Sequence, residues 1–137
     1  MLLEGKKGLV MGIANERSIA WGIAHEAYQN GAKLCLTYQN ELFKERIDKL
    51  ASSINCDFIL NCDVENQTSI KKLFDKISNV WGEIDFIVHA IAFSDKTELK
   101  GEFYNTTKEN FNRTMLISSF SLTEISKEAQ HLMDKNG

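Results

Sequence analysis

Four short apolar runs alternate with segments of helical periodicity along this chain, and that alternation restricts the possible folds more than any other feature. The runs are "GLVMG" (8–12), "KLCLTY" (33–38), "DFILNCD" (57–63) and "DFIVHA" (85–90). None has the strict apolar–polar alternation of a strand with one face in water, so we expect parallel strands covered on both faces. Each helical segment is then the crossover of a βαβ unit, which predicts an α/β fold with a doubly wound parallel sheet.

Apolar residues recur at helical spacing in each of the three segments between these strands. The predicted inward-facing residues are Ile19, Ile23, Ala24 and Ala27 in the first helix, Phe43, Ile47, Leu50, Ala51 and Ile54 in the second, and Ile70, Leu73, Phe74, Ile77 and Trp81 in the third. Gly31 and Gly82 follow the first and third helices, at positions where glycine commonly ends a helix.

A last helix is expected after the fourth strand and a polar stretch (93–110). Its apolar stripe consists of Phe111, Met115, Leu122, Ile125, Ala129 and Leu132, and the stripe either packs on the sheet or forms a subunit contact. The turn-like pair Asn136–Gly137 stands where a fifth strand is expected to begin. We therefore expect only the first four strands of one domain in residues 1–137. A fourth strand without its neighbour leaves an open edge, which predicts an unstable or aggregating isolated chain.

Composition excludes several classes of protein. The 16 Lys and Arg against 19 Asp and Glu give a net charge of −3 without a basic block, which makes nucleic acid an unexpected partner. No stretch approaches the ~20 apolar residues of a membrane span, and the start is not a signal peptide. Cys35, Cys56 and Cys62 have neither CxxC nor zinc spacing, so we expect reduced thiols, no metal site and a cytoplasmic protein.

Ligands of a doubly wound sheet bind beyond the carboxyl ends of its strands, and the first such end is "VMGIANERSIA". Gly12 can take the tight turn after the strand, and Ser18 and Ile19 stand where the helix begins. Helix N-terminal amides attract a pyrophosphate, and the Ser18 hydroxyl can add a donor. The alternative is that Gly12 is only a turn residue and Ser18 only an N-cap.

The second and third strand ends suit an adenosine. Gln39 occupies the position where a dinucleotide site usually places an Asp or Glu on the ribose, and no Arg or Lys is immediately adjacent, although Lys44 and Arg46 follow on the next helix. This favours NADH over NADPH. Asp63 can accept from the adenine amine while the Val64 amide donates to the ring, and the alternative is that Asp63 caps the third helix.

The fourth strand end, "HAIAF", supplies small or apolar residues that let a cofactor lie close to the backbone. These residues are Ala90, Ile91 and Ala92. We interpret the preceding His89 as a packed strand residue rather than an acid or base, because no carboxylate partner is evident in the sequence.

Taken together, "GIANERSIAWGIA", "LTYQNE", "CDV" and "VHAIAF" resemble the NADH-dependent enoyl-[acyl-carrier-protein] reductases, a divergent branch of the short-chain dehydrogenases. The resemblance extends over all 137 residues. Ordinary short-chain reductases have T-G-x-x-x-G-x-G and N-A-G motifs, and this chain has neither. The resemblance implies a Rossmann-like fold, NADH (NAD) as cofactor, an enoyl substrate carried on acyl carrier protein, a role in fatty-acid biosynthesis and a homotetramer.

The same resemblance implies a role for each matching position. Pyrophosphate contacts fall on Gly12, Ala14, Ser18 and Ile19, and adenosine contacts on Gln39, Asp63 and Val64. Ala90, Ile91 and Ala92 approach the adenosine ribose and nicotinamide side, and Ser94 matches a substrate-pocket position.

The family's proton donor is a tyrosine with a lysine seven residues later, after the fifth strand, and no tyrosine here has that partner. Tyr104 and Lys108 have Tyr-x-x-x-Lys spacing, but Thr106 and Thr107 are helix-start signals that put Tyr104 outside the helix. We therefore assign no catalytic residue, and expect the 137 residues alone to bind nucleotide weakly at best and to be inactive. A β-ketoacyl reductase of the same superfamily and a non-catalytic nucleotide-binding module are the alternatives.

Overall fold

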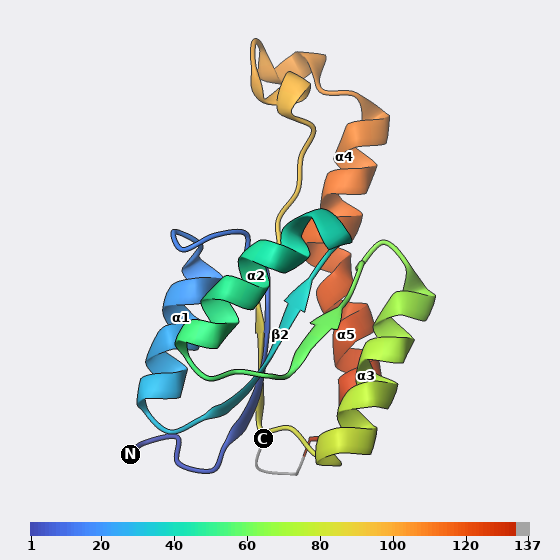
Figure 1. Cartoon of the computed structure of the whole chain (residues 1–137). Coiled ribbons are helices and arrows are strands. Elements are labelled where there is room, and N and C mark those ends of the chain that lie inside the picture. Colours follow the sequence, from blue (N-terminus) through green and yellow to red (C-terminus); the bar gives the residue numbers. More distant parts are fainter. Residues whose placement is uncertain (134–137) are drawn as a thin grey trace.

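The computed structural model describes residues 1–133 and contains four strands in the order β3-β2-β1-β4 (Figure 1). The strands are β1 (Lys7–Met11), β2 (Lys33–Tyr38), β3 (Ile59–Asn61) and β4 (Phe86–His89), and every pairing is parallel. The predicted doubly wound sheet is confirmed, with a third strand shorter than the predicted 57–63. The chain steps outward from β1 to β3 and then returns to the other side of β1. Strand order therefore reverses between β1 and β4.

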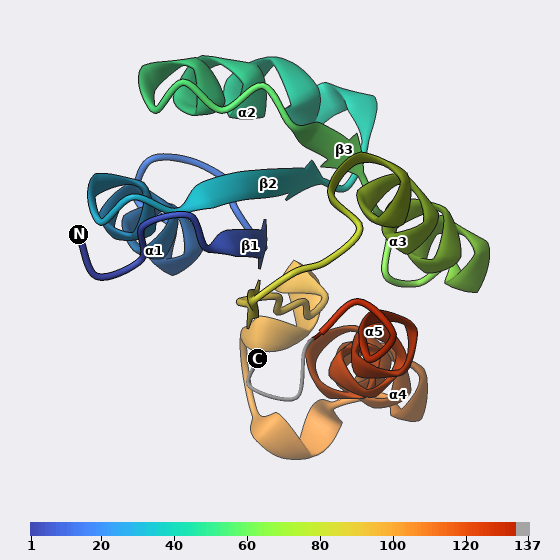
Figure 2. The same cartoon turned by 90° about the horizontal axis from the view of Figure 1, so that it is seen from below.

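Helices cover both faces of this sheet (Figure 2). Helices α1 (Ile19–Gln29) and α2 (Glu41–Ser53) lie on one side, and α3 (Gln67–Trp81) and α5 (Ser121–Ala129) on the other. Helix α4 (Lys108–Met115) joins α5 through a π-helical turn, η3 (Leu116–Phe120). Between β4 and α4, the chain projects away from the sheet and forms two short 3₁₀ helices, η1 (Lys96–Leu99) and η2 (Phe103–Asn105) (Figure 1).

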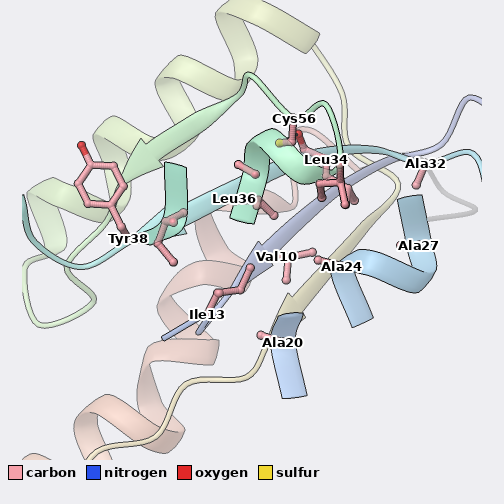
Figure 3. Close-up of a cluster of buried hydrophobic side chains, with 13 residues drawn as sticks. Val10, Ile13, Ala20, Ala24, Ala27, Ala32, Leu34, Leu36, Tyr38 and Cys56 are labelled. Atoms are coloured by element: carbon pink, nitrogen blue, oxygen red, sulfur yellow. The ribbon is translucent and has the colours of Figure 1, made fainter. Parts of the chain in front are cut away.

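The sheet separates two hydrophobic cores, because successive strand residues face opposite sides. Val10, Leu34 and Leu36 pack with α1 and α2 (Figure 3). Leu9, Met11 and Cys35 pack with α3 and α5. The inward faces predicted for α2 and α3 are confirmed, and Gly82 ends α3 in the left-handed conformation at φ 73°. All three cysteines are buried and free.

The predicted face of α1 is partly wrong. Ala20, Ala24 and Ala27 are buried against the sheet, whereas Ile19 is 79% exposed and Ile23 is 39% exposed. Alanine methyl groups let the helix axis approach the strands closely, and the larger isoleucines are accommodated only on the outer side. The first helix therefore packs on a stripe of small residues.

The stripe predicted for the last helix is also divided. Phe111 (57% exposed), Met115 and Leu122 are exposed, while Ile125 and Ala129 are buried beside α3. A π turn contains more residues than an α turn, so η3 rotates the following residues relative to α4. Neither single interpretation of the stripe is right: its second half is core, and its first half is open surface.

After α5 the chain returns to the open side of β4. The Ile84 amide donates to the Leu132 carbonyl at 2.8 Å, and Ile84 forms an isolated parallel bridge with Met133. The turn predicted at Asn136–Gly137 lies outside the described residues.

The close packing of α1 predicts that enlarging its buried face destabilises the fold. We expect Ala24→Leu to lower the free energy of unfolding by about 1–3 kcal/mol, because a fully buried alanine has no room for three more carbons. The matched variant Ile19→Ala should change it by less than about 0.5 kcal/mol. Urea unfolding followed by circular dichroism measures both, and the reverse order of effects would contradict this orientation of α1.

Candidate functional site

A cleft of about 200 Å³ lies at the carboxyl ends of the strands, around the point where strand order reverses. All four strand ends contribute to it, as expected for a ligand site in a doubly wound sheet. The residues that line it are Met11, Gly12, Ile13 and Ala14 after β1, Thr37, Gln39 and Phe43 around the β2–α2 turn, Cys62, Asp63, Val64 and Glu65 after β3, Ala90, Ile91, Ala92 and Phe93 after β4, and Ile117 in η3.

Most of the predicted site residues meet in this cleft. Those among its lining are Gly12, Ala14, Gln39, Asp63, Val64, Ala90, Ile91 and Ala92. Ser18, Ile19 and Ser94 are described residues outside the lining. The Ser94 hydroxyl instead accepts a hydrogen bond from Asn110 Nδ2 at 3.1 Å.

Gly12 brings two strand ends into direct backbone contact. Its φ is +105°, which disfavours other residues, and a Cβ built on it would lie 2.0 Å from the Ala90 carbonyl oxygen. The Ala90 amide also donates to the Met11 carbonyl at 3.1 Å. Glycine is therefore required here both for its conformation and for the close approach to β4.

Ser18 organises the loop between β1 and α1. Its Oγ accepts hydrogen bonds from the Ala14 amide at 2.9 Å and the Asn15 amide at 3.1 Å. Ser18 is at the N-cap position but makes no side-chain bond to the helix, so the simple N-cap interpretation is wrong. A hydroxyl has two acceptor sites and one donor. With both acceptor sites used, its proton remains available to a ligand, beside helix amides that have no intrahelical partner.

The side chains of Gln39 and Asp63 are not used as helix caps. Asn40 caps α2, and Asn66 caps α3 by accepting from two amides, so the alternative role for Asp63 is wrong. Asp63 Oδ1 accepts from the Glu65 amide at 3.0 Å, and the Asp63 amide donates to Ser69 Oγ at 2.9 Å. These bonds fix the turn after β3 and leave Asp63 Oδ2 without a bond in the described part of the chain.

An ion pair joins two walls of the cleft. Arg113 Nε donates to Glu65 Oε1 at 2.8 Å, and its second bond, from Nη2 to Oε2, is 3.1 Å long. The guanidinium also lies over the Phe93 ring, 4.4 Å from the centroid. The hydrogen bond from Arg113 lowers the pKa of the Glu65 carboxyl, so the pair stays ionised at neutral pH.

Three side chains that could take part in catalysis are not set up to do so. Burial raises the pKa of the Cys62 thiol to about 12, which keeps it protonated. Burial lowers the pKa of His89, whose Nε2 lies 2.7 Å from Ser121 Oγ, as expected for a packed strand residue. Tyr104 is 71% exposed in η2, outside the helix that Thr107 caps, and is not part of the lining.

Sequence reasoning missed several lining residues. Phe93 is the last residue of the stretch "HAIAF", in which only Ala90, Ile91 and Ala92 were predicted as site residues. Thr37 and Phe43 flank the β2–α2 turn. Ile117 comes from a distant helix, and no local pattern identifies its position.

Within residues 1–133, no group of His, Cys, Asp and Glu could hold a metal ion, and no helix is long and apolar enough to cross a membrane.

Comparisons with known proteins agree on one family. A family model described as enoyl-(acyl carrier protein) reductase matches residues 12–137. The chain is 53% identical to the enoyl-[acyl-carrier-protein] reductase [NADH] 2 of Rhizobium meliloti over 136 residues, which are 99% of this chain and 51% of that protein.

Solved structures are similar in fold as well as in sequence. The enoyl-(acyl-carrier-protein) reductase of Anaplasma phagocytophilum in complex with NAD has a TM-score of 0.93 and 46% identity, over 96% of this chain and 50% of that chain. The Bacillus cereus enoyl-acyl carrier protein reductase with NADP⁺ and indole naphthyridinone has a TM-score of 0.92 and 41% identity, over 96% and 52%. The chain spans about half the length of the curated relatives it matches.

The contact between Gly12 and Ala90 predicts a large effect of a single methyl group. Gly12→Ala is expected to cost more than about 3 kcal/mol of unfolding free energy, because a backbone carbonyl must move in addition to the strain of a positive φ. Gly5→Ala is the matched control, since Gly5 has φ +75° and open space around it. Its cost should be only about 1–2 kcal/mol. Equal losses for the two variants, measured by urea unfolding, would contradict the close approach.

Proposed function

The chain belongs to the enoyl-(acyl carrier protein) reductase family, and from this premise we propose that the protein reduces trans-2-enoyl thioesters carried on acyl carrier protein, with NADH as reductant. Residues 1–137 would be the N-terminal part of a single NAD(P)-binding domain. The reaction would belong to fatty-acid biosynthesis. The observation that carries the proposal is the cleft at the switch point, where the predicted pyrophosphate, adenosine and nicotinamide positions meet.

The pyrophosphate is proposed to bind at the start of α1. Gly12 and Ala14 provide backbone at the cleft, and Ser18 retains one hydroxyl proton to donate. Ile19 has an exposed side chain, so its proposed contact is through the backbone amide. Helix N-terminal amides and a hydroxyl donor together suit a dianionic group.

The adenosine half is proposed to bind Gln39, Asp63 and Val64, and the nicotinamide side to follow Ala90, Ile91 and Ala92. Asp63 supports this with an oxygen that no protein group occupies within the described residues. Gln39 supports NADH over NADPH, because an amide brings no positive charge to a ribose phosphate. Arg46 Nη1 donates to the Ala14 carbonyl at 3.3 Å, so this nearby cation is engaged with the loop.

When bound, NADH would supply the hydride for the β-carbon of the enoyl thioester. The residues of this chain would bind and orient the cofactor and keep its reactive side against the β4 end. We propose that Ser94 lies at the substrate pocket, on a segment fixed by the Asn110 bond. The described residues of the cleft include no tyrosine, so no catalytic proton donor is assigned within this chain.

A homotetramer is part of the proposal. The exposed apolar residues of the last helical segment support a subunit contact, because a surface this apolar is rarely left in water. They are Phe111, Met115, Leu116, Phe120 and Leu122. Light scattering of the complete protein should give four times the chain mass, and Phe111→Asp should lower that mass. A monomeric wild type would contradict this assembly.

The buried free thiols support a cytoplasmic location.

The activity is tested on the complete product of the coding sequence. We expect NADH to be consumed when a crotonyl thioester is added, because the proposed reductase saturates that double bond. Turnover with an acetoacetyl thioester instead would indicate a β-ketoacyl reductase, and NADH binding without turnover would indicate a nucleotide-binding module. Either result would overturn the proposed reaction.

Ser18→Ala is the site variant of the same experiment. It should weaken NADH binding at least about tenfold, because it removes a donor to a charged group and two loop bonds. Ser78→Ala, on the exposed side of α3, is the matched control and should bind like the wild type. Titration calorimetry with NADH and NADPH measures the affinities. Unchanged binding by the Ser18 variant would contradict the assigned pyrophosphate position.

A further inference from the structure

One helical turn holds both ends of the short segment that carries Ala90, Ile91 and Ala92. His89, directly before the segment, contacts Ser121, and Phe93, directly after it, contacts Ser118. Ser118 lies in the π-helical turn η3, and Ser121 is the first residue of α5. These serines come from a part of the chain more than twenty residues away in sequence, and no cofactor position was predicted there.

Ser121 links His89 to the helix backbone through two hydrogen bonds. The Ser121 hydroxyl donates to the Ile117 carbonyl at 2.7 Å, so its contact with His89 Nε2, also 2.7 Å long, requires the imidazole to donate. Ser121 is completely buried, which shields this chain of two hydrogen bonds from water. The bonds therefore connect the end of β4 to Ile117, whose side chain lines the cleft.

Ser118 binds the backbone of Phe93 through two hydrogen bonds. The Phe93 amide donates to Ser118 Oγ at 3.0 Å, and the same hydroxyl donates to the Phe93 carbonyl at 3.3 Å. A single side chain thus satisfies both backbone polar groups of one residue. The Phe93 peptide is held in position without a neighbouring strand.

The segment between these two anchors has few hydrogen bonds of its own. The Ala90 amide donates to the Met11 carbonyl, and Ile91 and Ala92 make no hydrogen bond within the described residues. Ala90 and Ile91 also pack against the two cores, so the anchors at 89 and 93 add the hydrogen bonds that fix the backbone at each end of the segment. A π turn is often found where a helix serves a functional site, and here it sets Ile117, Ser118 and Ser121 toward the end of β4.

We propose that Ser118 and Ser121 are positioning residues for the nicotinamide side of the bound cofactor. They act through Phe93 and His89, which fix the Ala90–Ala92 backbone at the wall that the reactive half of the cofactor would follow. This inference rests on the proposed function. Because the two serines support only this wall, the adenosine side of the cleft is independent of them.

The test compares two ligands that share one half. ADP carries the adenosine and pyrophosphate but lacks the nicotinamide, whereas NADH carries both. In the complete protein, Ser118→Ala should weaken NADH binding about tenfold and leave ADP binding unchanged, because two hydrogen bonds to the Phe93 backbone are lost. Ser118→Cys, of nearly the same size but with weaker hydrogen bonds, should fall between this variant and the wild type.

Ser119→Ala is the matched control, because Ser119 is exposed on the same turn and should leave both affinities unchanged. Equal weakening of NADH and ADP by the Ser118 variants would indicate a merely structural role and overturn the inference, as would unchanged NADH binding. If Ser118→Ala does not fold, the NADH-to-ADP ratio of Ser118→Cys decides the question in the same way. Failure of the proposed function is recognised separately, because turnover of the crotonyl thioester by the wild type tests the reaction without any serine variant.

Discussion

The contact between the backbones at Gly12 and Ala90 is the constraint on which the rest of this site depends. It joins the ends of β1 and β4 at the point where strand order reverses, with no side chain between them. A bulkier residue would separate the two strand ends and open the floor of the cleft. The lining residues that follow β1 and β4, such as Ala14 and Ile91, therefore depend for their spacing on the absence of a Cβ at position 12.

The loop after Gly12 compensates for glycines that a tighter phosphate loop would have. Ser18 turns back to accept the Ala14 and Asn15 amides, so a side chain closes the loop that backbone flexibility would otherwise close. The alanine face of α1 then lets the helix approach the sheet as a glycine would. This loop, with its widely spaced glycines, thus closes through a serine side chain and lets the helix approach the sheet through alanines.

The sheet and its four strand ends could be predicted because buried parallel strands leave unmistakable apolar runs. The orientation of α1 could not, since periodicity alone ranks Ile19 above Ala20, whereas close packing selects the smaller residue. The π turn could not be predicted either, because no local residue pattern indicates an extra residue in a helical turn. That turn brings Ile117 into the cleft, and so this contribution from a distant helix was missed. Roles that depend on hydrogen-bond direction, as for Ser18 and Ser121, could be assigned only from the three-dimensional structure.

The acidic side chains at the cleft present an apparent conflict with an anionic ligand, and Arg113 resolves it. Glu65 is ionised at neutral pH, and its charge is matched by a bidentate guanidinium that also lies on the Phe93 ring. Exposed ion pairs stabilise folds little, but a bidentate pair with a ring contact fixes geometry as well as charge. Asp63 then remains as the carboxylate whose second oxygen has no hydrogen bond in the described part of the chain. The open oxygen of Asp63 is therefore at the position where we propose that the adenine amine binds.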